Sequence, residues 1–141
     1  MTVPQLTLLG FALWTLLLLM VTVGVYRWQL ILTGRAEIHT FAPEAPSGAD
    51  WYRRGTRAHL NCIENLPVYA TIVFALSQLA VDGPLVDTLC CLVLGARLCQ
   101  TTVHVGFVQT ARAVSFRFSF YTVQLLSMLG LIGLIGARLW A

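Results

Sequence analysis

Long apolar runs alternate with short polar stretches along this chain, and the runs predict its architecture. A bilayer-spanning helix needs about 20 consecutive, mostly apolar residues. Four segments meet that length: residues 3–26, 60–81, 85–110 and 118–137. The first and fourth contain no charged residue, whereas the third contains Asp87 and Arg97 as well as His104. The pattern predicts an all-α integral membrane protein, with a single four-transmembrane-helix bundle over residues 1–141.

The connections between the runs carry helix-ending and helix-starting signals. Residues 40–50 hold two prolines and a glycine, so we expect a loop over about residues 33–50. The first helix is expected to continue past the membrane to about Leu32. Asp50 is expected to cap the second helix, because its carboxylate can accept from the free amide groups of the first turn. That helix would then begin near Trp51.

The last helix is expected to begin near Ser115, after the third helix ends by about Gln109. It carries Gly130, Gly133 and Gly136. Small residues at this spacing allow close approach of helix backbones inside a bilayer. We interpret these glycines as helix-packing positions.

Composition agrees with a membrane location and argues against a nucleic-acid partner. The 141 residues are 57% hydrophobic and 11% charged, with a net charge of +3, whereas soluble domains carry roughly 25% charged residues. The basic residues are all arginines and are spread over the loops, so no nucleic-acid partner is expected. Arginine usage without lysine is typical of a GC-rich bacterial genome, which favours a bacterial inner membrane over the endoplasmic reticulum.

Arginine counts predict how the chain is oriented. The first connection holds five arginines, the third holds Arg112 and Arg117, and the second holds none. Because cytoplasmic connections carry an excess of basic residues, we expect the first and third connections in the cytoplasm and both termini outside. Arg138 is the one charge that disagrees. The amino terminus lacks the basic region and cleavage site of a signal peptide, so the first run is interpreted as a retained span.

Three of the four helices carry a polar stripe. Residues at i, i+3 or i+4, and i+7 lie on one helix face. The three stripes with this spacing are Arg57, Asn61 and Glu64; Arg97, Gln100 and His104; and Arg117, Tyr121 and Gln124. With the expected orientation they fall mainly in the cytoplasmic half, where a single cavity open to the cytoplasm would hold them all.

Two interpretations of the stripes stay open. In the structural one, Glu64 pairs with Arg97 and interhelical hydrogen bonds fix the register of the bundle. In the functional one, Arg57, Arg97 and Arg117 outnumber the single carboxylate and leave a positive cavity. A guanidinium binds a carboxylate through two parallel hydrogen bonds, so this cavity would suit a ligand that carries carboxylates.

Other reactive side chains have simpler interpretations. The four cysteines lie inside the predicted spans without Cys-x-x-Cys or Cys/His ligand spacing, so we expect reduced, buried thiols and no metal site. Cys62 lies off the stripe and is interpreted as a packing residue. His59 faces away from Asn61 and is expected at the membrane interface rather than as a catalytic base.

Residues 57–67, Arg-Ala-His-Leu-Asn-Cys-Ile-Glu-Asn-Leu-Pro, resemble the signature of MAPEG. This family comprises the membrane-associated proteins in eicosanoid and glutathione metabolism, including microsomal glutathione transferases and the leukotriene and prostaglandin synthases. The matching core is Arg-Ala-x-x-Asn-x-x-Glu followed by proline. Chain length, four spans, a long first connection and arginines in the third and fourth helices extend the resemblance to the whole chain.

The resemblance implies a homotrimer that binds glutathione as a co-substrate between neighbouring subunits, on the cytoplasmic side and without a metal. Carried over by position, Arg57, Asn61 and Glu64 would hold the carboxylates and amino group of glutathione, and Arg97 would support them from the third helix.

The remaining site residues follow from the same resemblance. Gln100, His104 and Tyr121 are grouped with the glutathione-binding residues, although the synthases have tyrosines where this chain has Gln100 and His104. Arg117, four residues before Tyr121, is similar in placement to the family arginine that stabilises the thiolate. Arg112 is the rival for that role.

The implied function is a glutathione-dependent transferase or peroxidase that acts on lipophilic electrophiles or lipid hydroperoxides. The alternative is a non-enzymatic lipid-binding or scaffold member of the same family, which would need neither Arg117 nor Arg112. A third class, a small four-helix transporter, is disfavoured because such exporters usually place an essential carboxylate in the first span. The first span here has none.

Overall fold

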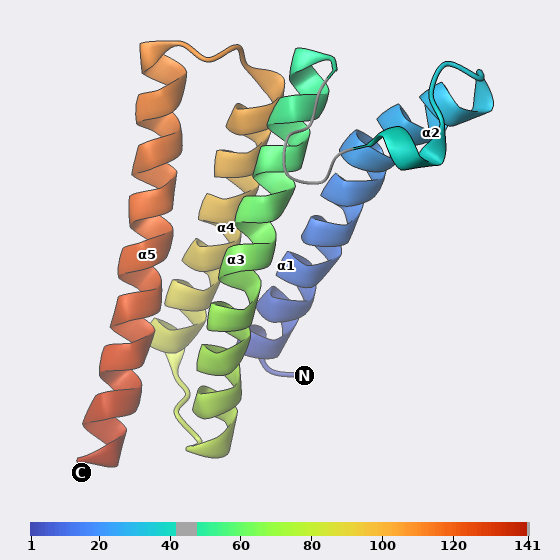
Figure 1. Cartoon of the computed structure of the whole chain (residues 1–141). Helices are drawn as coiled ribbons and strands as arrows, with labels where there is room; N and C mark the ends of the chain where they lie inside the picture. The colour runs from blue at the N-terminus through green and yellow to red at the C-terminus, as the bar shows by residue number, and fades with distance from the viewer. Residues whose placement is uncertain (42–47, 141) are drawn as a thin grey trace.

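The computed structural model describes residues 1–41 and 48–140, and every regular element within them is helical (Figure 1). Four helical segments are long and apolar enough to cross a membrane: Val3–Leu32, Asp50–Gln78, Pro84–Gly106 and Ala111–Leu139. The first comprises α1 (Val3–Leu18), a π-helical segment η1 (Leu19–Gly24) and α2 (Val25–Leu32), and the other three are α3, α4 and α5. The prediction of an all-α, four-helix membrane protein is confirmed.

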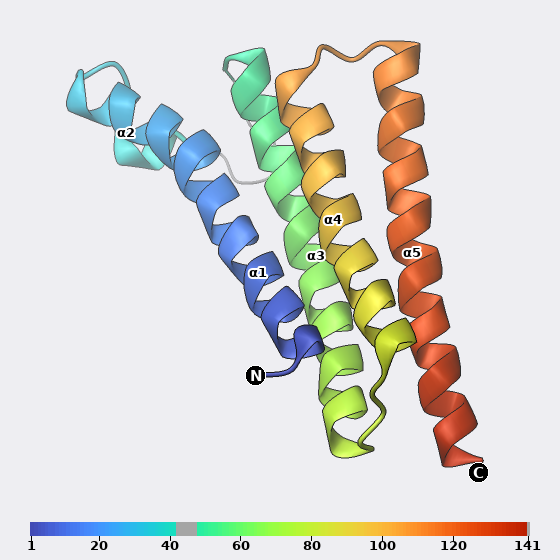
Figure 2. The same cartoon turned by 180° about the vertical axis from the view of Figure 1, so that it is seen from behind.

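The long helices lie side by side and alternate in direction (Figures 1 and 2). The end of α2, the start of α3 and the α4–α5 connection lie at one end of the bundle. The α3–α4 connection and both chain termini lie toward the other end. The first connection, with its short 3-10 helix η2 (Ile38–Thr40), therefore shares an end with the third. This arrangement agrees with the expected topology, and the side that faces the cytoplasm stays a prediction.

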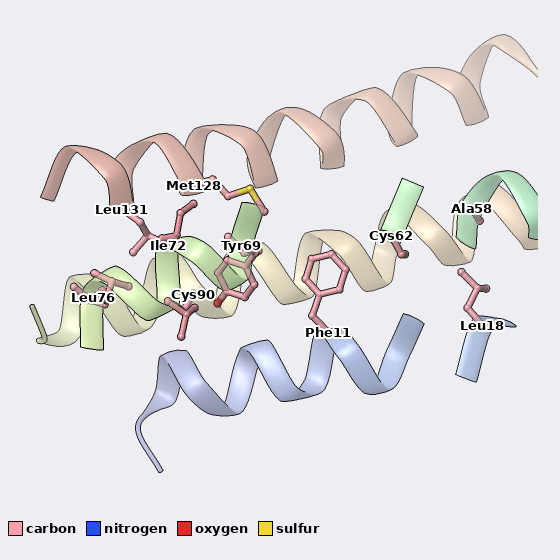
Figure 3. Packing of buried hydrophobic residues seen from close by; sticks show 13 residues of the cluster. Phe11, Leu18, Ala58, Cys62, Tyr69, Ile72, Leu76, Cys90, Met128 and Leu131 are labelled. Atoms are coloured by element: carbon pink, nitrogen blue, oxygen red, sulfur yellow. The ribbon is translucent and has the colours of Figure 1, made fainter. Parts of the chain in front are cut away.

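The core follows the inward faces of α1, α3, α4 and α5 (Figure 3). On α3 the buried positions recur every three or four residues, as expected for one face of a helix: Cys62, Tyr69, Ile72, Val73 and Leu76. The Tyr69 hydroxyl lies 2.6 Å from the Thr7 hydroxyl of α1. A buried hydrogen bond of this kind stabilises by about 1 kcal/mol, and it ties α1 to α3 next to apolar core contacts.

Glycines permit close helix contacts. Only one of the three glycines that the sequence predicted for this role takes part in one. A Cβ atom at Gly55 of α3 would lie 2.6 Å from Cβ of Thr22 in η1, so these two segments touch backbone to side chain. Of the three predicted packing glycines, Gly130 contacts Leu89 of α4. Gly133 and Gly136 have nothing within 4 Å among the described residues.

The helix boundaries depart from the predictions at two caps. Ala49, not Asp50, is the N-cap of α3. Asp50 is the first helical residue, and its carboxylate lies 3.7 Å from Arg53, so it offsets the positive end of the helix dipole from within the first turn. The start of α5 lies earlier than Ser115, because the Thr110 side chain accepts a hydrogen bond from the Ala113 amide and caps the helix there.

Residues 42–47, in the middle of the loop predicted over residues 33–50, lie outside the described residues. Around them, α2 ends at Leu32 as predicted. Helices α3 and α5 are 29 residues each, so they are longer than the apolar runs from which they were predicted. At about 1.5 Å per residue each is about 44 Å long, which spans the hydrocarbon core of a bilayer together with its headgroup layers.

Candidate functional site

The polar stripe of α3 faces outward. Arg57 and Glu64 are exposed and Asn61 is half-buried, because the opposite face of α3 is used for packing against α1 and α4. Glu64 lies near the middle of this 29-residue helix and is the fifth residue of the apolar run 60–81, so it falls just inside the part of α3 expected to cross the membrane. A charged side chain at that depth costs at least a few kcal/mol unless it has a partner or a wet cavity.

Glu64 finds no such partner within the described part of the chain. The ion pairs in residues 1–41 and 48–140 join Glu37 to His39 and Asp50 to Arg53. The pair of Glu64 with Arg97 that the structural interpretation required is therefore absent among the described residues. Its physical reason is direction, since Glu64 points out of the bundle whereas Arg97 points into it.

The polar stripe of α4 faces inward. Arg97 is only 1% exposed, and Gln100 and His104 are also buried. The Arg97 guanidinium lies over the ring of Phe11, with its central carbon 5.3 Å from the ring centroid. Among the described residues, its Nε and one of its Nη atoms have no hydrogen-bond partner, and neither does Oε1 of Gln100. Arg97 is thus a buried cation whose hydrogen-bonding capacity is largely unused.

The stripe of α5 combines buried and exposed positions. Gln124 is 1% exposed, Arg117 is half-buried and Tyr121 is 38% exposed. Nε2 of Gln124 lies 3.5 Å from Oδ1 of Asn65 on α3, at the outer limit of a hydrogen bond. Within the described chain Nε of Arg117 is buried without a partner. Arg117 therefore lies on the flank of the bundle, between the buried and exposed polar groups.

Among the described residues, the polar stripes do not meet in the single cavity expected from the sequence. The stripes separate into two groups: Arg57, Glu64 and Tyr121 are exposed, whereas Arg97, Gln100 and His104 are enclosed. Asn61 and Arg117 lie between these groups. The sequence had grouped these residues by periodicity, which relates residues on one helix but leaves open which way their shared face points.

The two rival arginines of α5 lie on different faces. Five residues separate Arg112 from Arg117, which corresponds to about 140° around the helix axis. Arg117 is seven residues from the buried Gln124 and shares its side of α5. Arg112 is exposed and lines a separate surface groove. Only Arg117 is therefore continuous with the polar groups of the bundle.

Three further side chains of α3 differ in how well the sequence predicted their contacts. His59 is buried and its Nδ1 lies 3.2 Å from the Thr15 carbonyl oxygen of α1, so its expected place at the membrane interface is wrong. Cys62 is fully buried beside Arg97, in agreement with its interpretation as a packing residue. Asn65 contacts Gln124 of α5. Its position directly after Glu64 places it on a different face of α3 from the polar stripe, and this could have suggested a contact inside the bundle.

An aromatic cluster holds the end of the first membrane segment against α3. The Tyr26 ring stacks on Tyr52 with centroids 4.2 Å apart and meets Trp51 edge-on. Nε of Arg27 donates to the Tyr52 hydroxyl at 3.0 Å, and the same guanidinium lies over Phe41. The sequence had used Arg27 only as a topology charge, yet it anchors the connection near the exposed polar row.

Comparison with known proteins identifies the family. The model of the MAPEG family matches residues 6–137, which is nearly the whole chain. No curated protein matches the chain. The matched region includes all of α3 and α4, the Arg57, Asn61 and Glu64 row, and all but the outermost residues of the first and last long helices. The chain therefore belongs to the MAPEG family of four-helix membrane proteins, which includes glutathione-dependent enzymes and also members that are not enzymes.

Proposed function

We propose that this protein is a glutathione-dependent transferase or peroxidase that acts on lipophilic electrophiles or lipid hydroperoxides. Its site is formed on the outward row of α3, at the contact between subunits of a homotrimer and on the cytoplasmic side of the membrane. Family membership supports this proposal in general terms, and one feature of the chain supports it in particular.

The observation that carries the proposal is the exposure of Glu64 at the middle of a membrane helix without an ion partner among the described residues. Lipid solvates a carboxylate poorly, so this position favours cover by a polar ligand or another protein surface. Glutathione offers one ammonium group and two carboxylates. Glu64 suits the ammonium group, Arg57 suits a carboxylate through its planar fork, and Asn61 can both donate and accept between them.

The enclosed side chains would support this site from behind. Arg97 adds positive charge in a region of low dielectric, where its field reaches further than in water. Its unpaired N–H groups and the unpaired Oε1 of Gln100 supply hydrogen-bonding capacity close to the ligand face. We assign Arg97, Gln100 and His104 to this supporting role, since their burial leaves the ligand contacts to the outward row.

Arg117 is assigned to the chemistry of the thiol. A guanidinium beside the sulfur favours the thiolate, which is the nucleophile. In conjugation the thiol proton leaves to solvent, sulfur forms a bond to carbon, and halide departs with the electrons of the broken bond. In peroxide reduction sulfur attacks one oxygen, the O–O bond breaks, and the alcohol leaves protonated. A second glutathione then converts the sulfenic acid to disulfide and water.

The experiment uses the full-length protein, purified in detergent. We expect it to conjugate glutathione to a chlorinated dinitrobenzene or to reduce a lipophilic hydroperoxide. Arg117→Ala should lower kcat about a hundredfold, the usual loss when one group that stabilises developing negative charge is removed. The matched control is Arg138→Ala, an exposed arginine at the far end of the same helix, which should retain activity.

Other outcomes assign the roles differently. Loss of activity in Arg112→Ala but not in Arg117→Ala would transfer the thiolate role to Arg112. Absence of both activities despite bound glutathione would contradict the proposal. Fatty-acid binding without glutathione binding, measured by calorimetry, would instead support the non-enzymatic lipid-binding alternative.

A further inference from the structure

The first two turns of α5 border a groove that the proposed site does not use. The groove has a volume of about 400 Å³ and is lined by Ala111, Arg112, Ser115, Phe116 and Ser119. These residues lie away from the side of α5 that buries Gln124, Ser127 and Met128. The groove therefore opens to the surroundings of the bundle rather than to its interior.

The depth of this groove in the membrane follows from the length of α5. The helix is 29 residues long and measures about 44 Å at 1.5 Å per residue. A bilayer measures about 40–45 Å when its headgroup layers are included. A helix of this length crosses both layers, so its first turn lies at the level of the lipid phosphates.

The groove changes from basic to apolar along the helix. Arg112 is exposed, and neither ion pair of the described residues includes it. The hydroxyls of Ser115 and Ser119 donate to backbone carbonyls one turn earlier, at 3.0 Å each, and their small size keeps the groove open.

Beside the serines and beyond them the same face becomes apolar. Phe116 is 60% exposed, and Val123 and Leu126 continue the stripe at 39% and 61%. An amphiphile with an anionic head and an acyl chain matches this order of a charged end followed by an apolar track.

We propose that this groove binds an anionic phospholipid, whose phosphate contacts Arg112 and whose acyl chain lies along Phe116, Val123 and Leu126. Charge complementarity favours a lipid over a second copy of this chain. Among the described residues, the carboxylates at this end of the bundle, Glu37 and Asp50, already pair with His39 and Arg53. Within the described part of the chain, neither of these two carboxylates is therefore free to pair with Arg112.

The test measures lipid binding to the full-length protein by native mass spectrometry, with phosphatidylglycerol and phosphatidylcholine of identical acyl chains. Wild type should bind phosphatidylglycerol more tightly, and Arg112→Gln should weaken that binding about fivefold, the usual effect of one basic residue at an anionic membrane surface. Arg138→Gln makes the same charge change at the other end of α5 and should leave the binding unchanged.

A second variant tests the groove without changing charge. Ser115→Phe fills the groove and should also weaken phosphatidylglycerol binding, while circular dichroism verifies that the protein remains folded. Millimolar inorganic phosphate should not displace the lipid, because the apolar track contributes to binding. Displacement by phosphate, equal binding of both lipids, or unchanged binding in Arg112→Gln would overturn the proposal. So would a change of oligomeric state in Ser115→Phe with lipid binding intact.

Discussion

The polar rows of α3 and α4 have similar spacing in the sequence and opposite positions in the structure. Arg57 and Glu64 lie on an exposed face, whereas Arg97 and His104 lie inside the bundle. An inward polar row can be accommodated by neighbouring helices, but an outward charged row at membrane depth needs a partner from outside the chain. The difference identifies the α3 row as the surface that meets a ligand and the α4 row as its support.

The largest expected effect comes from the outward row. Arg57→Ala should raise KM for glutathione about 10- to 100-fold, because it removes charge-assisted hydrogen bonds worth about 1.5–3 kcal/mol. Steady-state kinetics with varied glutathione measures this effect. Arg138→Ala, an exposed arginine near the end of α5, should leave KM unchanged, and equal effects of both substitutions would remove the distinction between the row and the rest of the surface.

The next largest effect is on stability, and it compares a glycine in a close helix contact with a glycine in open space. Gly55→Ala should destabilise the protein by about 1–3 kcal/mol, since the added methyl would lie 2.6 Å from Cβ of Thr22 and force the helices apart. Gly133→Ala adds the same methyl where nothing lies within 4 Å among the described residues, and should be neutral or slightly stabilising. Thermal unfolding in detergent compares them, and similar melting temperatures for the two variants would argue against the close contact of η1 with α3.

The smallest effect on folding is expected at the inward row, where removing a charge should leave the melting temperature unchanged or raise it. Arg97→Met should leave Tm unchanged or raise it, because replacing a poorly paired buried ion by an apolar side chain of similar length is often neutral or stabilising. The same substitution should raise KM for glutathione only about threefold to tenfold, as its charge acts from behind the ligand face. A strong fall in Tm would mean that protein groups fully satisfy this guanidinium.

Sequence patterns predicted the number of membrane helices and their order, because each apolar run exceeds the thickness of the bilayer core. They also grouped Arg57, Asn61 and Glu64 on one face. They did not predict that Glu64 and Arg97 point apart, since periodicity fixes angles within one helix but not the rotation of that helix in the bundle. The cap at Ala49 and the contact of Gly55 with Thr22 depend on backbone geometry that composition does not encode.

The central claim is that the outward row of α3 binds glutathione, and isothermal titration calorimetry on the detergent-purified protein tests it most directly. Wild type should bind glutathione saturably, and Glu64→Gln should weaken the binding at least about tenfold, as expected when a charged partner of the ammonium group is neutralised. Arg138→Gln, the control near the end of α5, should bind as wild type does. Equal affinity of wild type and Glu64→Gln, or no binding by wild type, would contradict the account.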